Sequence, residues 1–222
     1  MRDLSEDYGV IFGATGFLGS RVALDLAKLN ANLILQGRSL EKLKFLDDQI
    51  KKVNKKATFL QADVTSSNFY ENILKKISSR FQRLDFILNL VGQFNGLRPL
   101  THFTHKDWDK LIEVNISFYW RIIKELEPLI RKSKNSKIIF ITNKNISKGK
   151  AYHNIFSISK SATDSMLKVL SKENNKLNIN TFLIEIETLN AGMSSSLTGN
   201  KKIDENILEK TSSKIIQKCF QS

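Results

Sequence analysis

The sequence predicts an α/β protein: one doubly wound domain over residues 1–222, in which a parallel sheet of six or seven strands carries helices on both faces. Two observations favour this fold class. Apolar runs of strand length alternate along the chain with longer stretches of helical period, and no repeat, low-complexity tract or Gly/Pro-rich linker interrupts the alternation. Strict alternation of strands and helices is typical of parallel sheets covered on both faces.

The strands are expected where short apolar runs occur, because such runs fill the interior of a parallel sheet. In chain order the runs are YGVIFG, NLILQG, ATFLQ, DFILN, KIIFIT and NTFLIEI. They place the strands at 8–13, 32–37, 57–61, 85–89, 137–142 and 180–186.

The longer segments between these runs have the period of amphipathic helices. Thr65 to Ser67 offer N-caps to the third helix, and Pro128 is expected to end the fourth, because proline breaks a helix interior. The polar segment 186–202 is expected to form a loop on the substrate side. The expected helices span about 17–29, 40–52, 65–80, 106–132, 154–173 and 203–219.

The composition is that of an ordinary soluble globular protein, with 41% hydrophobic and 26% charged residues. Its longest apolar runs are far shorter than the roughly 20 residues that span a bilayer, so no membrane partner is expected. Acidic residues in the stretch MRDLSEDYGV argue against a secretory signal. A single cysteine, Cys219, excludes an internal disulfide and fits a cytoplasmic location, and no metal site is expected.

The net charge of +13 raises the question of a nucleic-acid partner. The basic residues are scattered through the expected helices, and arginine is scarce where phosphate and base recognition would favour it. We therefore expect no nucleic-acid partner. The charge instead favours an anionic cofactor or substrate.

A glycine-rich loop lies between the first strand and the first helix. Gly13, Gly16 and Gly19 in FGATGFLGSR have a GxxGxxG spacing. Glycines here let the backbone approach a pyrophosphate, and the helix N-terminus offers free N–H groups. A tight turn without a ligand is the alternative, but the position after the first of six alternating units favours a dinucleotide.

The end of the second strand indicates which dinucleotide binds. It reads QGRS, with Arg38 where an NAD-preferring domain usually carries an acid. A guanidinium suits a 2′-phosphate, so NADP is favoured over NAD. A solvated arginine that opens a helix is the alternative.

Several motifs together resemble the short-chain dehydrogenase/reductase family of Rossmann-fold, NAD(P)-dependent oxidoreductases. The resemblance runs from about Tyr8 to Gly192 and includes GATGFLG, ADV, RLDFILNLVG, LIEVNISFYW and SISKSATDSMLKVL. The resemblance implies a small carbonyl or alcohol substrate and a homo-oligomer, with a homodimer formed through helices 106–132 and 154–173. It implies cofactor-binding roles for Gly13, Thr15, Gly16, Phe17, Leu18, Gly19, Arg38, Asp63, Val64, Asn89, Gly92 and Lys160.

The same resemblance implies a catalytic tetrad that is incomplete here. Asn115 and Lys160 fall on two of its positions, but the tyrosine position holds Phe156 and the serine position holds Asn143. A phenylalanine ring has no dissociable proton. The sequence therefore predicts an oxidoreductase that is slow or uses another proton donor, or alternatively a non-catalytic NADP-binding protein that acts as a sensor or partner subunit.

Five side chains near these positions could supply a proton or polarise a carbonyl. For each of them a packing or surface role is the simpler interpretation. They are Thr142, Asn143, Tyr152, His153 and Tyr119.

Overall fold

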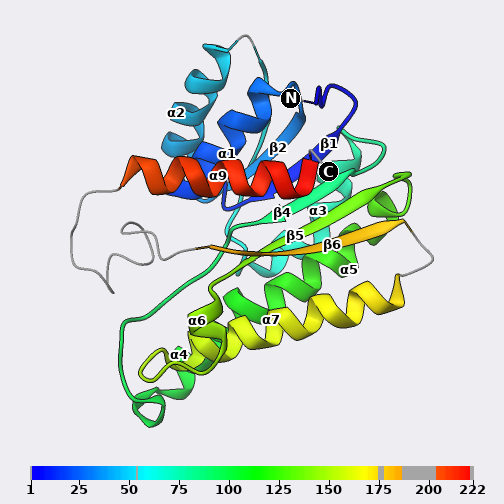
Figure 1. The fold of residues 1–222 in the computed structure, drawn as a ribbon. Helices are drawn as coiled ribbons and strands as arrows, with labels where there is room; N and C mark the ends of the chain where they lie inside the picture. The colour runs from blue at the N-terminus through cyan, green and yellow to red at the C-terminus, as the bar shows by residue number, and fades with distance from the viewer. Residues whose placement is uncertain (1, 54, 175–177, 187–203, 221–222) are drawn as a thin grey trace.

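The computed structural model describes residues 2–53, 55–174, 178–186 and 204–220 of the chain. Its described strands form one parallel sheet in the order β3-β2-β1-β4-β5-β6 (Figure 1). The predicted doubly wound α/β fold is thus confirmed, with six strands in the part described. They are β1 (Tyr8–Phe12), β2 (Asn32–Gly37), β3 (Thr58–Gln61), β4 (Phe86–Asn89), β5 (Ser136–Thr142) and β6 (Ile179–Glu185).

Helices cover both faces of this sheet (Figure 1). One face packs against α1, α2 and α9, and the other packs against α3, α5 and α7. The helices are α1 (Phe17–Lys28), α2 (Leu40–Lys51), α3 (Ser67–Ser78), α4 (His105–Ile112), α5 (Phe118–Ile130), α6 (Lys144–Ser147), α7 (Asn154–Glu173) and α9 (Glu205–Phe220), with a 3₁₀ turn η1 (Leu100–His102) and a π-helical stretch η2 (Glu113–Ser117).

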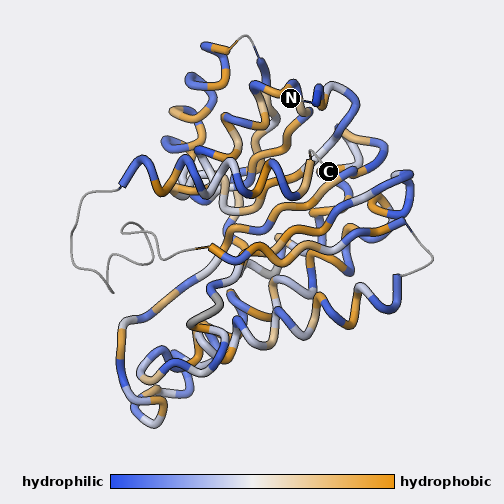
Figure 2. Tube along the Cα trace, in the orientation of Figure 1, coloured by the Kyte–Doolittle hydropathy of each residue, from blue (hydrophilic) through white to orange (hydrophobic). Residues whose placement is uncertain are grey.

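The two apolar cores follow the alternation of side chains along each strand. In β5, Ile139 and Ile141 join the core under α1 and α9, whereas Ile138 and Phe140 join the core under α5. The hydropathy of the trace shows the result, because the strands are hydrophobic along much of their length while the helices alternate (Figure 2). Both sheet faces are therefore buried, which explains the continuous apolar runs in the sequence.

The central strands approach each other closely at Gly9 and Phe86. These residues are partners in the register of β1 and β4. A Cβ atom at Gly9 would lie 2.1 Å from the Phe86 ring, which also packs edge-on against Phe220 of α9 with 4.9 Å between centroids. The Phe86 ring therefore occupies the space of a side chain at position 9.

The predicted helix 106–132 differs from the observed one in detail. Helical structure runs from His105 to Ile130 through η2, so it ends near Pro128 as expected, although Pro128 itself lies inside α5. Proline removes only its own N–H bond, and the helix ends within three residues of Pro128, where Arg131 N–H donates to Glu127 at 2.9 Å. The short elements η1 and α6 were not predicted.

Helix α9 packs across α1 by polar as well as apolar contacts. Ser212 Oγ donates to Asp25 Oδ2 at 2.8 Å, and the Arg21 guanidinium lies 2.7 Å from the Asp25 carboxylate and 3.5 Å from that of Glu209.

The helix predicted at 203–219 is observed at 205–220. The expected substrate-side loop 186–202 lies outside the described residues, apart from Ile186.

Candidate functional site

The candidate site lies where the strand order reverses. From β1 the chain proceeds outward through β2 and β3, and then returns to β4 on the other side of β1 before continuing to β5 and β6. A crevice at the carboxyl ends of the strands forms at such a point and is the usual ligand site of doubly wound sheets. The loop after β1 and the loop after β4 therefore flank the candidate site.

The glycine-rich loop has the geometry of a phosphate cradle. Gly13 has a φ of +76°, which favours glycine, and a Cβ atom at Gly19 would lie 2.2 Å from the Gly13 carbonyl oxygen. In the described part of the chain, α1 begins after Gly16 with no side-chain cap and no acid in its first turn. Its free N–H groups and positive dipole end suit the pyrophosphate of a dinucleotide.

A buried glutamine holds this loop in place. Gln36, only 1% exposed, accepts a hydrogen bond from Gly13 N–H at 3.0 Å through Oε1, and its Nε2 donates to the Ala62 carbonyl at 2.7 Å. The sequence analysis missed this residue. The available signal was a polar side chain inside the apolar run NLILQG, since a buried amide needs partners.

Arg38 and Asp63 follow the ends of β2 and β3. Arg38 is exposed just after β2. Burial opposes ionisation of Asp63, but hydrogen bonds from Thr65 at 2.9 and 2.8 Å and the charges of Arg38 and Lys110 outweigh it and lower the pKa of the carboxyl. Asp63 therefore stays ionised close to an arginine that can also reach an anionic ligand.

Thr15 and Gly37 bring the loop after β1 against the end of β2. A Cβ atom at Gly37 would lie 2.5 Å from Thr15 Cγ2.

The other predicted binding residues differ in exposure. Phe17 at the start of α1 is exposed, while Leu18 is buried in the core. Val64 is likewise buried, beside Asp63, and Gly16 N–H donates to the Gly13 carbonyl at 3.1 Å.

At the end of β4, the side-chain N–H donor of Asn89 has no partner among the described residues. Asn89 is fully buried, and its Oδ1 accepts from Val91 N–H at 3.0 Å. Among the described residues nothing pairs with its Nδ2. Buried polar atoms are rarely left unpaired, so this donor fits a hydrogen-bond acceptor of a ligand in the crevice. Gly92, three residues later, is partly exposed on the same loop.

Asn115 fixes the loop after β4 from the helical side. It lies in the π-helical stretch η2, and its side chain accepts from Gln93 N–H and donates to the Gln93 carbonyl, both at 2.8 Å. Single-turn π-helices inside α-helices occur frequently at functional sites. The structure thus brings Asn115 to the same loop as Asn89, although the two are far apart in sequence.

Lys160 and Phe156 lie on one face of α7, as their spacing predicts. Lys160 is 8% exposed, and its Nζ donates to the Ile141 carbonyl at 2.9 Å. The amine lies 5.3 Å from the centroid of the Phe156 ring and 5.9 Å from that of Tyr119. Burial lowers the pKa of Lys160 to about 8. The amine is therefore inside the protein near the carboxyl end of β5.

The end of β5 positions Thr142 and Asn143. The Asn143 carbonyl accepts from the N–H groups of Ile146 and Ser147, each at 3.0 Å, so Asn143 opens the short helix α6. The Thr142 hydroxyl is buried with no partner in the described part of the chain. Like Asn89, it is a polar group at a strand end that a ligand could satisfy.

The other candidate proton donors lie in less suitable places. Tyr119 is fully buried, its hydroxyl donates to the Val91 carbonyl at 2.6 Å, and burial raises the pKa of the phenol. Tyr152 is 62% exposed in the turn before α7. His153 is buried with Nδ1 at 2.9 Å from the Ala151 carbonyl oxygen, and its ring lies 6.2 Å from Phe94.

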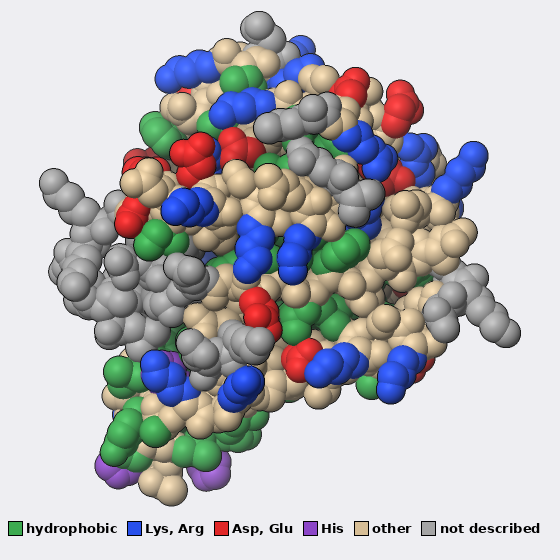
Figure 3. All heavy atoms as spheres, viewed as in Figure 1, with side chains coloured by type: hydrophobic (Ala, Val, Ile, Leu, Met, Phe, Trp, Pro, Cys, Tyr) green, Lys and Arg blue, Asp and Glu red, His purple; other side chains and the backbone are tan. Residues whose placement is uncertain are grey.

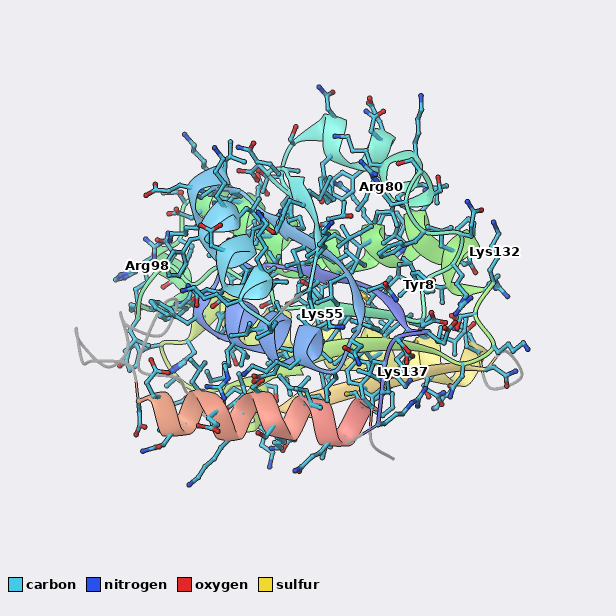
Figure 4. All side chains as sticks on the ribbon, turned by 90° about the horizontal axis from the view of Figure 1, so that it is seen from above. Tyr8, Lys55, Arg80, Arg98, Lys132 and Lys137 are labelled. Carbon is cyan, nitrogen blue, oxygen red and sulfur yellow. The ribbon has the colours of Figure 1, made fainter. Side chains whose placement is uncertain are left out.

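Lysine and arginine side chains are scattered among other side chains on the face shown in Figure 3. Arg98 and Lys132 lie at opposite sides of the molecule in Figure 4. Among the described residues there is no cluster of His, Cys, Asp and Glu that could hold a metal ion, and none of the helices there is long and apolar enough to cross a bilayer.

Comparison with known proteins agrees with this geometry. The chain is 25% identical over 173 residues to an uncharacterized oxidoreductase of Staphylococcus epidermidis, covering 78% of this chain and 74% of the relative. It is 26% identical over 174 residues to the uncharacterized oxidoreductase YciK of Escherichia coli, covering 77% of this chain and 69% of YciK.

Solved structures show the same fold with a cofactor. A short chain dehydrogenase from Shigella flexneri complexed with NADP has a TM-score of 0.87 at 22% identity, covering 99% of this chain and 92% of that one. A short chain dehydrogenase from Escherichia coli complexed with NADPH has a TM-score of 0.86 at 22% identity, covering 97% and 90%. The family model for short chain dehydrogenases matches residues 9–202, and the chain therefore belongs to the short-chain dehydrogenase family.

Proposed function

We propose that the protein is an NADP-dependent oxidoreductase that interconverts a small carbonyl compound and its alcohol. The observation that carries this proposal is the phosphate cradle between β1 and α1. Its positive φ at Gly13, its close packing at Gly19 and the uncapped start of α1 all fit a pyrophosphate. The similar structures complexed with NADP and NADPH support the same cofactor.

The proposed function gives each part of the crevice a role. The cradle binds the pyrophosphate, Arg38 pairs with the 2′-phosphate, and Asp63 lies on the adenine side. Asn89, at the end of β4, offers its unpaired amide to the ligand. Bound NADPH supplies the hydride, and the residues around Lys160 orient the substrate and handle the proton. Asn143, at the end of β5, can donate its amide N–H to the substrate carbonyl.

A thermal-shift titration with NADPH and NADH tests the cofactor assignment. Ligand at about 100 times Kd should stabilise the protein by roughly 2.7 kcal/mol, which appears as a higher Tm. NADPH should act at lower concentration than NADH, and Arg38→Ser should weaken NADPH about tenfold or more while leaving NADH nearly unchanged. A Tm that neither nucleotide raises would contradict the proposal.

A second function is favoured by Phe156. Its ring has no dissociable proton, so the protein could bind NADP as a sensor or partner subunit without turnover. This alternative expects nucleotide-dependent stabilisation, no NADPH oxidation with any carbonyl in a broad panel, and no gain of activity in Phe156→Tyr. Any carbonyl-dependent NADPH oxidation by the wild-type protein would exclude it.

We also propose a homodimer formed through α5 and α7. Trp120 on α5 and Ile158 and Val169 on α7 are exposed apolar side chains. Contiguous exposed apolar surface often marks an interface. Light scattering should give the mass of two chains, and Val169→Glu should shift it toward one. A monomeric wild-type protein would refute this assembly.

A further inference from the structure

The amine of Lys160 is a buried cation without a counter-ion. In the described part of the structure its one hydrogen-bond acceptor is the Ile141 carbonyl oxygen, and no carboxylate forms an ion pair with it. An ammonium group has three N–H donors, so two of them are not used by that carbonyl. The centroids of the Phe156 and Tyr119 rings lie 5.3 and 5.9 Å from the amine.

The position of this amine places it at the edge of the sheet where the proposed reaction occurs. Its acceptor, Ile141, is the next-to-last residue of β5, and Asn143 follows two residues later. The unpaired hydroxyl of Thr142 lies between them in sequence. The amine contacts Ile141, and the hydroxyl and the amide belong to the next two residues, so all three groups come from the carboxyl end of β5 or contact it.

Reduction of a carbonyl requires a proton as well as a hydride. Hydride addition to carbon leaves negative charge on oxygen, and an acid within hydrogen-bond reach lowers the barrier. The Phe156 ring has no dissociable proton and cannot serve as this acid. The Tyr119 hydroxyl is committed to the Val91 carbonyl, and Tyr152 is exposed in a turn.

We propose that the ammonium group of Lys160 is itself the proton donor of the reaction. As hydride from NADPH reaches the carbonyl carbon, one N–H bond of Lys160 breaks and an O–H bond forms on the substrate oxygen, which leaves a neutral amine. Solvent returns the proton between turnovers. This inference rests on the proposed oxidoreductase function, in which NADPH supplies the electron pair.

The surroundings of Lys160 suit this role. Burial favours the neutral amine, and the pKa of about 8 leaves most of the group protonated at pH 7 yet acidic enough to release its proton. The titratable group facing it from α5 is the Tyr119 phenol, which stays neutral because burial raises its pKa. Phe156, on the same helix as Lys160, contributes an uncharged ring whose π face favours the cation.

Replacement of Lys160 by arginine keeps the positive charge of the side chain but removes its ability to donate a proton. Arginine keeps the positive charge that can bind the cofactor ribose and phosphates, but it does not release its proton in proteins. We expect Lys160→Arg to lower kcat for carbonyl reduction by about 10²–10⁴-fold, while Kd for NADPH changes far less. An Arg variant that reduces the carbonyl at the wild-type rate would overturn the assignment.

A second substitution provides the matched control. Phe156→Tyr in the Lys160→Arg background places a phenol next to the guanidinium, and that phenol can supply the proton. The double variant should regain at least about tenfold of the lost kcat. If it regains nothing while still binding NADPH as tightly as Lys160→Arg, the loss in the single variant reflects damaged geometry, and the donor role is refuted.

A measurement that does not depend on turnover completes the test. In protein labelled with ¹³Cε-lysine, the resonance that Lys160→Arg removes should titrate near pH 8, whereas surface lysines titrate near about 10.4. A Lys160 resonance that titrates with the surface lysines contradicts the proposal.

The pH profile and the wild-type activity separate the two proposals. The wild-type kcat for reduction should fall above about pH 8, and alcohol oxidation should rise there, because the neutral amine is then a base. A wild-type protein that oxidises no NADPH contradicts the proposed function and this role with it. A wild-type protein that turns over with a flat profile contradicts this role alone.

Discussion

At the scale of single residues, Gln36 shows how two loops of the candidate site are coupled. Its amide bridges Gly13 in the glycine-rich loop and Ala62 in the loop after β3. The Gln36 side chain is buried, so both of its partners would lose a hydrogen bond inside the fold if the amide were removed. A single side chain inside β2 therefore ties together the loops that follow β1 and β3.

We predict that Gln36→Leu weakens NADPH binding and the fold together. Leucine fills a similar volume but leaves Gly13 N–H and the Ala62 carbonyl without their partner, which costs about 1–3 kcal/mol each. The expected result is a Kd for NADPH raised about tenfold by calorimetric titration, and a lower urea midpoint. The control is Gln82→Leu, at an exposed glutamine after α3, which should change neither the Kd nor the urea midpoint. Unaltered NADPH affinity in Gln36→Leu would refute the bridging role of Gln36.

The sequence predicted some of these residues and missed others for a physical reason. Glycines at fixed spacing and a lysine four residues after Phe156 are visible because their geometry is local to one loop or one helix. Gln36 was missed because its partners lie in two other segments of the chain. The place of Lys160 on α7 was predictable, but its bond to Ile141 on β5 was not.

At the scale of elements, the helical segment from His105 to Ile130 owes its shape to a contact outside itself. Its amphipathic period predicts one regular helix, but the structure contains the π-helical stretch η2 around Asn115. The side chain of Asn115 binds both backbone groups of Gln93 in the loop after β4. Periodicity could not reveal this irregularity, because it depends on a loop more than twenty residues away.

We predict that Asn115→Ala loosens the loop after β4. The substitution removes both bonds to Gln93 and leaves its N–H and carbonyl unpaired, which costs about 1–3 kcal/mol per group. Hydrogen exchange should show at least about tenfold faster exchange of the Gln93 amide together with a lower Tm. Asn72→Ala on the exposed face of α3 is the control; unchanged exchange at Gln93 would show that Asn115 does not hold the loop.

At the scale of the whole molecule, the alternation of apolar runs and helical stretches was sufficient to predict the doubly wound sheet. The strand order β3-β2-β1-β4-β5-β6 follows from right-handed crossovers that reverse direction after β3. The sequence could not show how α9 closes one face, because its contacts with Asp25 and Phe86 join segments that are far apart in the sequence.

The buried ammonium of Lys160 also affects the stability of the entire fold. Its pKa falls from 10.5 in the unfolded chain to about 8 in the folded protein, a difference of roughly 3 kcal/mol that opposes folding at pH 7. Between about pH 8 and 10.5 the unfolded chain holds a proton that the folded protein has released. This term therefore becomes less unfavourable as pH rises through that window.

We predict that Lys160→Met stabilises the protein at pH 7. The gain should be about 1–3 kcal/mol after allowance for the lost bond to Ile141, because an uncompensated buried charge is replaced by an apolar chain of similar length. Urea unfolding of both proteins at several pH values should show the gain shrinking between pH 8 and 10.5. A gain that grows with pH would mean that Lys160 is not desolvated in the folded protein.

The contact of Gly9 with Phe86 limits which substitutions this sequence can accept during evolution. The two positions share one volume, since a Cβ atom at position 9 would lie 2.1 Å from the ring. Any larger residue at position 9 must therefore be preceded by a smaller one at position 86, which would in turn open a gap beside Phe220. The three positions are epistatic, and among descendants of this chain we expect them to covary as a set.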